Sequence, residues 1–206
     1  MKSFCGLLPV LCFGFMGRTT VIPVTSNIND FVMMGLKTNK QDSVAFEVVS
    51  NIHDGEITVA GKDGVGTTGK VTVTEGSVLQ RMVNEYMTAK FTKMSENGDV
   101  KVKITLKDFS LQDYNTQSAG MQVLGSLAGG SASYRQPRII TARIIAVLEI
   151  NRDGQEETKN LVTSAEENYV GQFTSEISNK AVADCINSAN NKVLMQMNAF
   201  FEEIGM

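Results

Sequence analysis

Apolar residues near the end of the chain recur every three or four positions across residues 179–204. That spacing predicts a long α-helix with one apolar face, made by Val182, Ile186, Ala189, Val193, Met197, Phe200 and Ile204. Upstream, residues 138–150 carry an apolar residue at every second position, which predicts a strand, and Asn151-Arg152-Asp153-Gly154 predicts a tight turn after it. Adjacent stretches therefore predict a sheet and a helix that covers it.

Shorter β-rich runs predict further strands at residues 20–24, 43–49, 56–60, 70–74, 99–106 and 157–170. The turn-forming residues 51–55 would join two of these strands, 43–49 and 56–60, as a hairpin. After Leu106 the apolar phase slips by one residue, to Phe109 and Leu111, which predicts a β-bulge. The last of these runs is less apolar than the others, as is typical of a strand at a sheet edge.

A second helix is predicted to begin with Ser77 as its N-cap and to end at a left-handed C-cap formed by Asn97-Gly98. One side of it would carry Leu79, Met82, Val83, Tyr86, Lys90 and Met94. The chain has 206 residues, 42% of them hydrophobic, which is enough for one sizeable core. We therefore expect a single α+β domain over residues 18–206, a two-layer sandwich in which two amphipathic helices pack on an antiparallel sheet.

The first residues of the chain have the pattern of an export signal. In residues 1–17, Lys2 precedes an apolar run that is too short to span a bilayer as a helix. A buried N-terminal helix or strand is the alternative interpretation. Cys12 is the candidate for a lipid anchor, although Leu11 stands where a lipobox has a small residue.

Processing of this segment would leave Cys185 as the only one of the 3 cysteines, so no intrachain disulfide is expected. Cys185 lies beside Ile186 on the apolar side of the last helix, which predicts a role in core packing. The 19 basic and 22 acidic residues give a net charge of -3, so the overall charge offers no electrostatic reason to expect binding to nucleic acid.

No set of residues predicts catalysis. The sequence Gly64-Val65-Gly66-Thr67-Thr68-Gly69-Lys70 satisfies part of a phosphate-loop motif, but Val71 replaces the hydroxyl residue and a strand, not a helix, is predicted to follow. A glycine-rich turn between two strands is the favoured interpretation. His53 is the sole histidine and falls in a predicted turn, which excludes a histidine-rich metal site. We expect the cluster Asp153, Glu156, Glu157, Glu166 and Glu167, and the lysines Lys101, Lys103 and Lys107, to be solvated faces.

Short motifs resemble those of YajG-type lipoproteins and of the wider group of transport-auxiliary lipoproteins. The first predicted helix carries Val78-Leu79-Gln80-Arg81-Met82 and Tyr86-Met87-Thr88-Ala89; the last hairpin and helix carry Asp153-Gly154, Thr158-Lys159-Asn160, Ser178-Asn179-Lys180-Ala181-Val182-Ala183-Asp184 and Asn187-Ser188. The resemblance implies an α/β sandwich in the periplasm, usually tethered to the outer membrane, without enzymatic activity, and it offers no catalytic residue.

Residues 115–137 are rich in Gly, Ser and Ala but also carry apolar side chains. If these residues form an exposed loop, another surface is expected to cover those side chains. The segment is open to three interpretations: a mobile linker, a short helix, or a contact surface for another subunit or a membrane. The contact residues we predict are Gly125, Leu127, Gly129, Tyr134 and Arg135, because glycine permits close backbone approach and Tyr and Arg are favoured at interfaces.

The function expected from these observations is that of a non-enzymatic accessory protein in a bacterial cell envelope, without cofactor or metal. It would lie in the periplasm or on the periplasmic face of the outer membrane. Its predicted partner is an envelope protein complex, and self-association and contact with the outer membrane stay open. One alternative is a periplasmic carrier of a lipid or other apolar ligand, which the 11 methionines would suit. A nucleotide-binding protein is a further alternative that rests only on the Gly64 loop.

Overall fold

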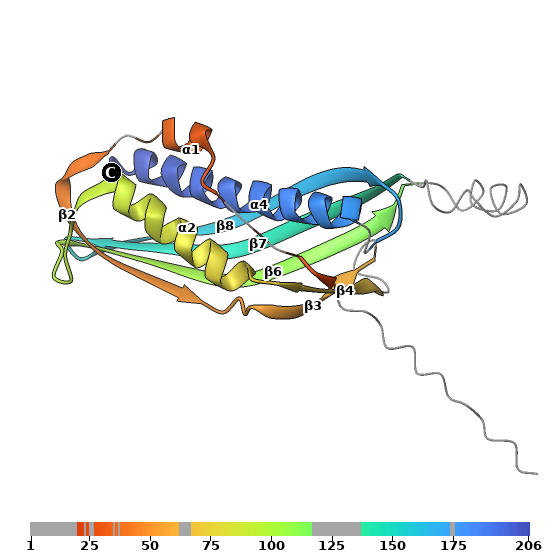
Figure 1. Ribbon diagram of the computed structural model, residues 1–206. Helices are drawn as coiled ribbons and strands as arrows, with labels where there is room; N and C mark the ends of the chain where they lie inside the picture. Colours follow the sequence, from red (N-terminus) through yellow and green to blue (C-terminus); the bar gives the residue numbers. More distant parts are fainter. Residues whose placement is uncertain are drawn as a thin grey trace, which may run out of the picture.

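The computed structural model describes residues 20–22, 24, 27–34, 36, 38–61, 67–116, 137–173 and 176–206. Within these ranges eight strands form one sheet and three helices accompany it, so the predicted α+β class is confirmed (Figure 1). The strands are β1 (Thr20–Val21), β2 (Asn39–Ser50), β3 (Gly55–Ala60), β4 (Thr67–Val73), β5 (Phe91–Met94), β6 (Val100–Asn115), β7 (Pro137–Arg152) and β8 (Gln155–Val170). The helices are α1 (Asp30–Met34), α2 (Glu75–Lys90) and α4 (Glu176–Glu203).

Helices α2 and α4 lie on the same face of the sheet, with α4 over β7 and β8 (Figure 1). Of the residues predicted to form the apolar face of α4, all but Ile204 are buried, and Ile204 packs against the core while partly exposed. The opposing strand β7 buries its alternating residues Ile140, Ala142, Ile144, Ala146, Leu148 and Ile150 against them. The apolar periodicities predicted for residues 179–204 and 138–150 are therefore confirmed, and the two apolar faces pack against each other. No described helix is long and apolar enough to cross a membrane.

The sheet is mixed, so the prediction of an antiparallel sheet is wrong. Antiparallel pairing joins β3 to β4, β6 to β7 and β7 to β8. Strands β2 and β3 instead run parallel to β6, β2 also runs parallel to β5, and β1 runs parallel to β4. Strand β6 is thus bordered by the β7–β8 hairpin on one side and by β2 and β3 on the other.

The predicted hairpin between residues 43–49 and 56–60 is also wrong. Strands β2 and β3 do not pair; they follow the same edge of β6 one after the other, in the same direction. The backbone N–H of Asn51 donates to the carbonyl of Leu106 at 2.8 Å, which keeps the chain on this edge after β2 ends. Gly55, at φ 138°, then gives the backbone a conformation open to glycine at the start of β3. The turn-forming residues therefore interrupt a strand instead of reversing it.

The predicted bulge in β6 is confirmed. The pairing register with β7 slips between Leu106 and Asp108, so Lys107 is the extra residue. Leu106 and Leu111 are both buried, and Phe109 packs against the core between them. The bulge keeps the apolar side chains on the helix-covered face along the whole strand.

Helix α2 differs from its prediction at both ends. Thr74, not Ser77, is the N-cap, and the Asp54 carboxylate accepts the Ser77 N–H at 3.0 Å and the Ser77 hydroxyl as well. Capping thus comes from the interruption between β2 and β3, which sequence spacing alone does not show. The helix ends at Lys90 because Phe91 is extended, at φ -115° and ψ 123°, and begins β5. Gly98 therefore lies in the β5–β6 turn and is no helix C-cap.

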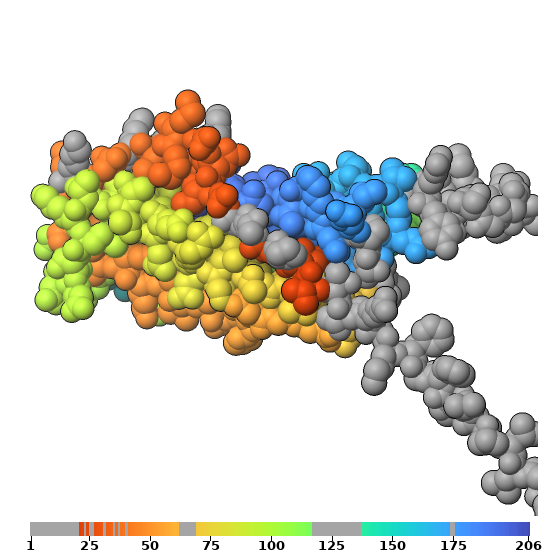
Figure 2. Space-filling view, in the orientation of Figure 1, coloured from red at the N-terminus to blue at the C-terminus, as the bar shows by residue number. Residues whose placement is uncertain are grey.

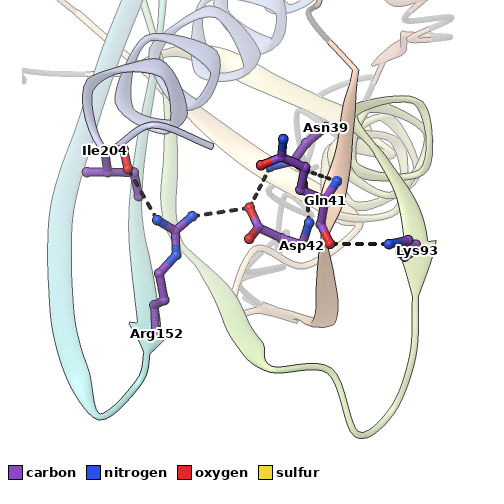
Figure 3. Close-up of polar contacts among 6 residues, drawn as sticks. All are labelled: Asn39, Gln41, Asp42, Lys93, Arg152 and Ile204. Carbon is purple, nitrogen blue, oxygen red and sulfur yellow. Dashed lines mark hydrogen bonds and ion pairs between the residues drawn. The ribbon is translucent and has the colours of Figure 1, made fainter.

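The predicted tight turn between β7 and β8 is confirmed, with Asp153 at φ 54° and Gly154 at φ 80°. Beside this turn, the Arg152 guanidinium donates to Asp42 Oδ2 of β2 at 3.2 Å and to the Ile204 carbonyl after α4 at 3.5 Å (Figure 3). Asn39 donates to the same Asp42 oxygen at 2.6 Å. These bonds connect the turn end of the hairpin to β2 and to the end of α4.

The segment between β1 and α1 crosses the two long helices. Figure 2 shows its described residues (red to orange) over the seam between α2 (yellow) and α4 (blue). Ile22 and Val24 of this segment are buried, as is Val32 of α1. Asn191 of α4 holds the segment: its side-chain oxygen accepts the Asn29 N–H at 2.7 Å, and its Nδ2 donates to the Asn27 carbonyl at 3.2 Å.

Candidate functional site at the end of the β6–β7 hairpin

The predicted contact residues Gly125, Leu127, Gly129, Tyr134 and Arg135, and the predicted lipidation site Cys12, lie outside the described residues. The structure does describe both flanks of the predicted contact loop. Thr116 donates its backbone N–H to the Pro137 carbonyl at 3.2 Å and its hydroxyl to the same oxygen at 3.1 Å. The two ends of the loop are therefore held side by side on neighbouring strands. We call the adjoining part of the sheet, residues 112–116, 137–141 and 166–170, the hairpin end.

A buried ion pair lies on the helix-covered face of the hairpin end. Asp113 of β6 is fully buried, and Arg138 of β7 contacts both of its carboxylate oxygens, with Nε at 3.2 and 3.1 Å and Nη2 closer to Oδ2. Tyr169 of β8 donates its hydroxyl to Asp113 Oδ1 at 2.7 Å. Three adjacent strands thus each contribute one side chain to a single hydrogen-bonded cluster.

The electrostatics of this cluster favour a positioning role over chemistry. Burial alone would lower the pKa of Arg138, but the hydrogen bond and charge of Asp113 outweigh it and raise that pKa. Burial and the bond to Asp113 also raise the pKa of Tyr169. The guanidinium and the phenol therefore keep their protons, and their donors are directed at Asp113. The cluster fixes the relative positions of β6, β7 and β8 where the loop leaves the sheet.

The opposite face of the hairpin end carries a patch that no described element covers. The pairing register puts Tyr114, Ile139 and Asn168 in one row across β6, β7 and β8. It puts Pro137 opposite Val170 two positions further along, on the same face. Val170 is 50% exposed, and Tyr114 and Ile139 are partly exposed. An aromatic and several aliphatic side chains are thus gathered on the open face, beside the flanks of the loop.

Cys185 confirms its predicted core role. Its sulfur lies 3.2 Å from the Ala142 N–H and donates to the Ala165 carbonyl at 3.1 Å, between β7 and β8. Burial raises the pKa of the thiol to about 12, with a further contribution from Glu167 that exceeds the opposing effect of Lys192, while the Ala142 N–H lowers it. The thiolate, which is the reactive form, is therefore disfavoured.

The phosphate-loop interpretation fails in its structural context. Lys70 lies inside strand β4, which pairs antiparallel with β3, and its ammonium group contacts Glu56 Oε1 at 2.7 Å. Strand β4 continues to Val73 and helix α2 begins only at Glu75, so no helix N-terminus at Lys70 directs backbone N–H groups at a phosphate. Gly69 instead allows Phe173 to approach, since a Cβ atom there would lie 2.9 Å from that ring. The alternative interpretation, a glycine-rich turn between paired strands, is confirmed for the strands that flank it.

The remaining predicted candidates are exposed, except Glu167, which is partly buried. His53 lies beside a hollow of about 220 Å³ that is also lined by Asp54, Lys107 and Asp108. The Asp54 carboxylate already accepts hydrogen bonds from Ser77. Burial alone would raise the pKa of Asp54, but the hydrogen bonds from Ser77 lower that pKa overall, so the Asp54 carboxylate remains ionised. The described part of the chain contains no group of three His, Cys, Asp or Glu side chains placed to hold a metal ion.

Two further hollows bear on the predicted apolar-ligand carrier. One of about 430 Å³ is lined by Ala45, Phe46, Glu47, Glu96, Lys101, Val102 and Lys103, and one of about 260 Å³ by Ile150, Arg152, Asp153, Gln155, Glu157 and Ile204. Charged side chains contribute to both linings. Both are partly open to solvent and would not enclose a lipid chain, so the carrier stays a prediction without support from these hollows.

The residues that sequence reasoning missed are polar groups at core positions. Asp113 follows Leu111 by two residues in β6, and that spacing was the available signal, because it puts a carboxylate on the buried face of a strand. Glu75, at the start of α2, is also fully buried and accepts a hydrogen bond of 3.4 Å from Asn190 of α4. Burial raises the pKa of Glu75 well above its usual value; the bond from Asn190 opposes this and the charge of Asp54 adds to it.

No family model matches this chain. No curated protein matches it either. Among solved structures it is similar to the protein XCC0632 from Xanthomonas campestris, of the family DUF330, at 11% identity over 91% of this chain and 96% of that one, with a TM-score of 0.49. It is also similar to a Caulobacter crescentus protein described as a "putative lipoprotein", at 9% identity over 84% of this chain and 94% of that one, with a TM-score of 0.38.

A third similar structure is that of a Helicobacter pylori protein described as a "putative neuraminyllactose-binding hemagglutinin homolog". Its identity to this chain is 7%, over 79% of this chain and 85% of that one, with a TM-score of 0.40. Identities this low show no shared family, and the resemblance to YajG-type lipoproteins stays a prediction.

Proposed function

We propose that this protein is a non-enzymatic accessory protein of a bacterial cell envelope, which binds a protein partner in a transport or surface assembly through the hairpin end. The observation that carries the proposal is the Asp113–Arg138–Tyr169 cluster. It stabilises three strands at the point where the predicted contact loop joins the sheet. A loop with firmly held ends loses less conformational entropy when it binds, so this rigidity favours affinity.

The open face beside the loop supplies the second part of the argument. Tyr114, Ile139 and Val170 share that face, and the part of the chain that the structure describes places no helix over it. Tyr is enriched at protein interfaces because it offers a large, rigid contact area together with a hydrogen-bonding hydroxyl. The patch and the loop together would form one continuous contact surface.

The envelope location is proposed from the N-terminal sequence. Residues 1–17 have the pattern of an export signal, and Cys12 is the proposed acceptor of a lipid. Cell fractionation followed by intact-mass measurement tests both together. We expect the protein in the envelope fraction with a mass that reports removal of the segment, acylation or both. An unmodified full-length mass in the cytosolic fraction would refute the location.

The binding role is tested with variants on each part of the surface. Tyr114→Asp with Val170→Asp, and separately Leu127→Asp with Tyr134→Asp, should each abolish recovery of cross-linked envelope partners while circular dichroism stays native. The matched control is Thr158→Asp with Asn160→Asp, which adds the same charge to the open face near the opposite end of β8. Equal recovery by all these variants would contradict the proposal.

A further inference from the structure

One edge of strand β8 pairs with no other described strand. The opposite edge pairs with β7 from Gln155 to Val170. The backbone groups of β8 alternate in direction, so every second residue directs its N–H and C=O away from β7. The Thr116 N–H donates to the Pro137 carbonyl, so the odd-numbered residues of β7 face β6 and the even-numbered ones face β8. The register pairs these even-numbered residues of β7 with odd-numbered residues of β8. The Val162 and Ser164 carbonyls agree with this alternation, because they accept hydrogen bonds from α4 side chains. The even-numbered residues of β8 therefore present the free edge.

Helix α4 covers the middle of this edge. Lys192 Nζ lies 2.6 Å from the Ser164 carbonyl, and Gln196 Nε2 lies 3.2 Å from that of Val162. Both bonds occupy acceptors that an added strand would need. They divide the free edge into two open stretches, residues 156–160 and residues 166–170. Only the second adjoins the hairpin end, where Asn168 lies in the same row as Ile139 and Tyr114.

The charge on the edge indicates the chemistry of an occupant. Strand β8 carries Glu156, Glu157, Glu166 and Glu167, and its only basic residue, Lys159, pairs with Glu203 of α4 at 3.3 Å. A second copy of this chain would bring no neutralising charge to this stretch. Antiparallel self-pairing centred on Asn168 would place each Glu166 opposite a Val170. A strand with Lys or Arg opposite Glu166 and an apolar residue opposite Val170 complements both positions.

We propose that residues 166–170 of β8 accept an extended, basic and apolar segment of a partner protein by strand addition. This inference rests on the proposed function, since it names how the partner binds at the hairpin end. Main-chain hydrogen bonds from the even-numbered residues would supply affinity, and Glu166 would select a basic side chain. The bonds from Lys192 and Gln196 would set the register by stopping the added strand before Ser164.

The test uses the full chain and two short labelled peptides, followed by fluorescence anisotropy. Glu166 and Val170 share one face of β8, so both peptides carry Val at the position opposite Val170, whereas the position opposite Glu166, four residues away on the same face, is Lys in one peptide and Glu in the other. Asn168→Pro removes an N–H that points away from β7, so it blocks strand addition without breaking the β7–β8 ladder. Asn160→Pro is the matched control at the same kind of position in the other open stretch. We expect the Lys peptide to bind, Asn168→Pro to weaken it at least about tenfold and Asn160→Pro to leave it unchanged.

Glu166→Lys provides a second variant that does not alter the backbone. It should weaken binding of the Lys peptide and allow the Glu peptide to bind. Equal binding of the Lys peptide to wild type and Asn168→Pro would overturn the inference, since both proteins carry the same charges. So would the absence of binding, or a wild-type dimer in solution that Asn168→Pro dissociates. If Tyr114→Asp with Val170→Asp abolishes partner recovery while Asn168→Pro does not, the proposed function stands and strand addition fails.

Discussion

The Glu75 carboxyl group is fully buried where α2 meets α4, and its Oε1 has no hydrogen-bond partner among the described residues. Because burial raises its pKa in the folded protein well above the value of an unfolded chain, folding favours the protonated form. The stability that this protonation gives is complete below the unfolded-state pKa, and it is lost as the pH rises through the folded-state pKa.

Replacement of Glu75 by Gln keeps the size of the side chain and removes the titration. We expect Glu75→Gln to raise the free energy of unfolding at pH 8 by about 1–3 kcal/mol and to change that free energy less at pH 5. Urea unfolding at the two pH values measures the difference. Glu157→Gln, at an exposed position of β8, is the control and should leave the pH dependence as in the wild type. A Glu75→Gln protein with wild-type pH dependence would mean that folding does not raise the pKa of this carboxyl.

Loss of one partner of the Asp113–Arg138 ion pair should destabilise the protein strongly, whereas replacement of the whole cluster by apolar side chains should destabilise it much less. Arg138→Met leaves the Asp113 carboxylate buried with only the Tyr169 hydroxyl, so we expect a loss of about 3–5 kcal/mol. The triple change Asp113→Leu, Arg138→Met and Tyr169→Phe removes every polar member and should return to within about 2 kcal/mol of the wild type. Chemical denaturation of the series checks both values. A triple variant as unstable as the single one would show that shape, not charge, governs this site.

At the scale of elements, sequence periodicity predicted the long helices and most strands, but it did not identify α1, it extended the second helix over β5, and it did not show how the strands pair. The interruption at residues 51–54 shows why. Turn-forming residues suit a reversal and a strand break equally well, and only the long-range pairing of β2 and β3 with β6 decides between them. The start of α2 was misplaced for a related reason. Its first turn is capped by Asp54, which is 23 residues away from Ser77 in sequence.

The β5–β6 turn packs directly on the backbone of β2 at Gly98. A Cβ atom at this position would lie 2.4 Å from the Ala45 nitrogen and 2.5 Å from the Val44 carbonyl carbon, and backbone atoms cannot rotate away as a side chain can. We expect Gly98→Ala to destabilise the protein by about 2–4 kcal/mol, measured by urea unfolding. Gly154→Asn is the control, because Asn tolerates the φ of 80° and nothing lies within 4 Å. A Gly98→Ala protein with wild-type stability would mean that this turn can move away from β2 without destabilising the protein.

At the scale of the whole molecule, the parts of the candidate site differ in how far the sequence could predict them. The contact segment could be proposed because the composition changes abruptly over residues 115–137, and it stays a prediction. The cluster that holds its base could not be predicted, because Arg138 and Tyr169 are 25 and 56 residues away from Asp113 and meet only once three strands are in register. Local patterns identify elements, whereas a buried polar cluster depends on the complete sheet.

The segment between β1 and α1 should behave as a separable layer over the two long helices. Its described contacts with α4 include the two bonds made by Asn191, while Ile22, Val24 and Val32 contribute burial. Asn191→Ala removes both bonds, and we expect amide hydrogen exchange in residues 29–34 to accelerate at least about tenfold, while the central residues of β7 keep their protection. Met195→Ala, on the next turn of α4 at a 44% exposed position, is the matched control. If Asn191→Ala accelerates exchange equally in β7 and α1, the segment unfolds only together with the sheet and is not a separate layer.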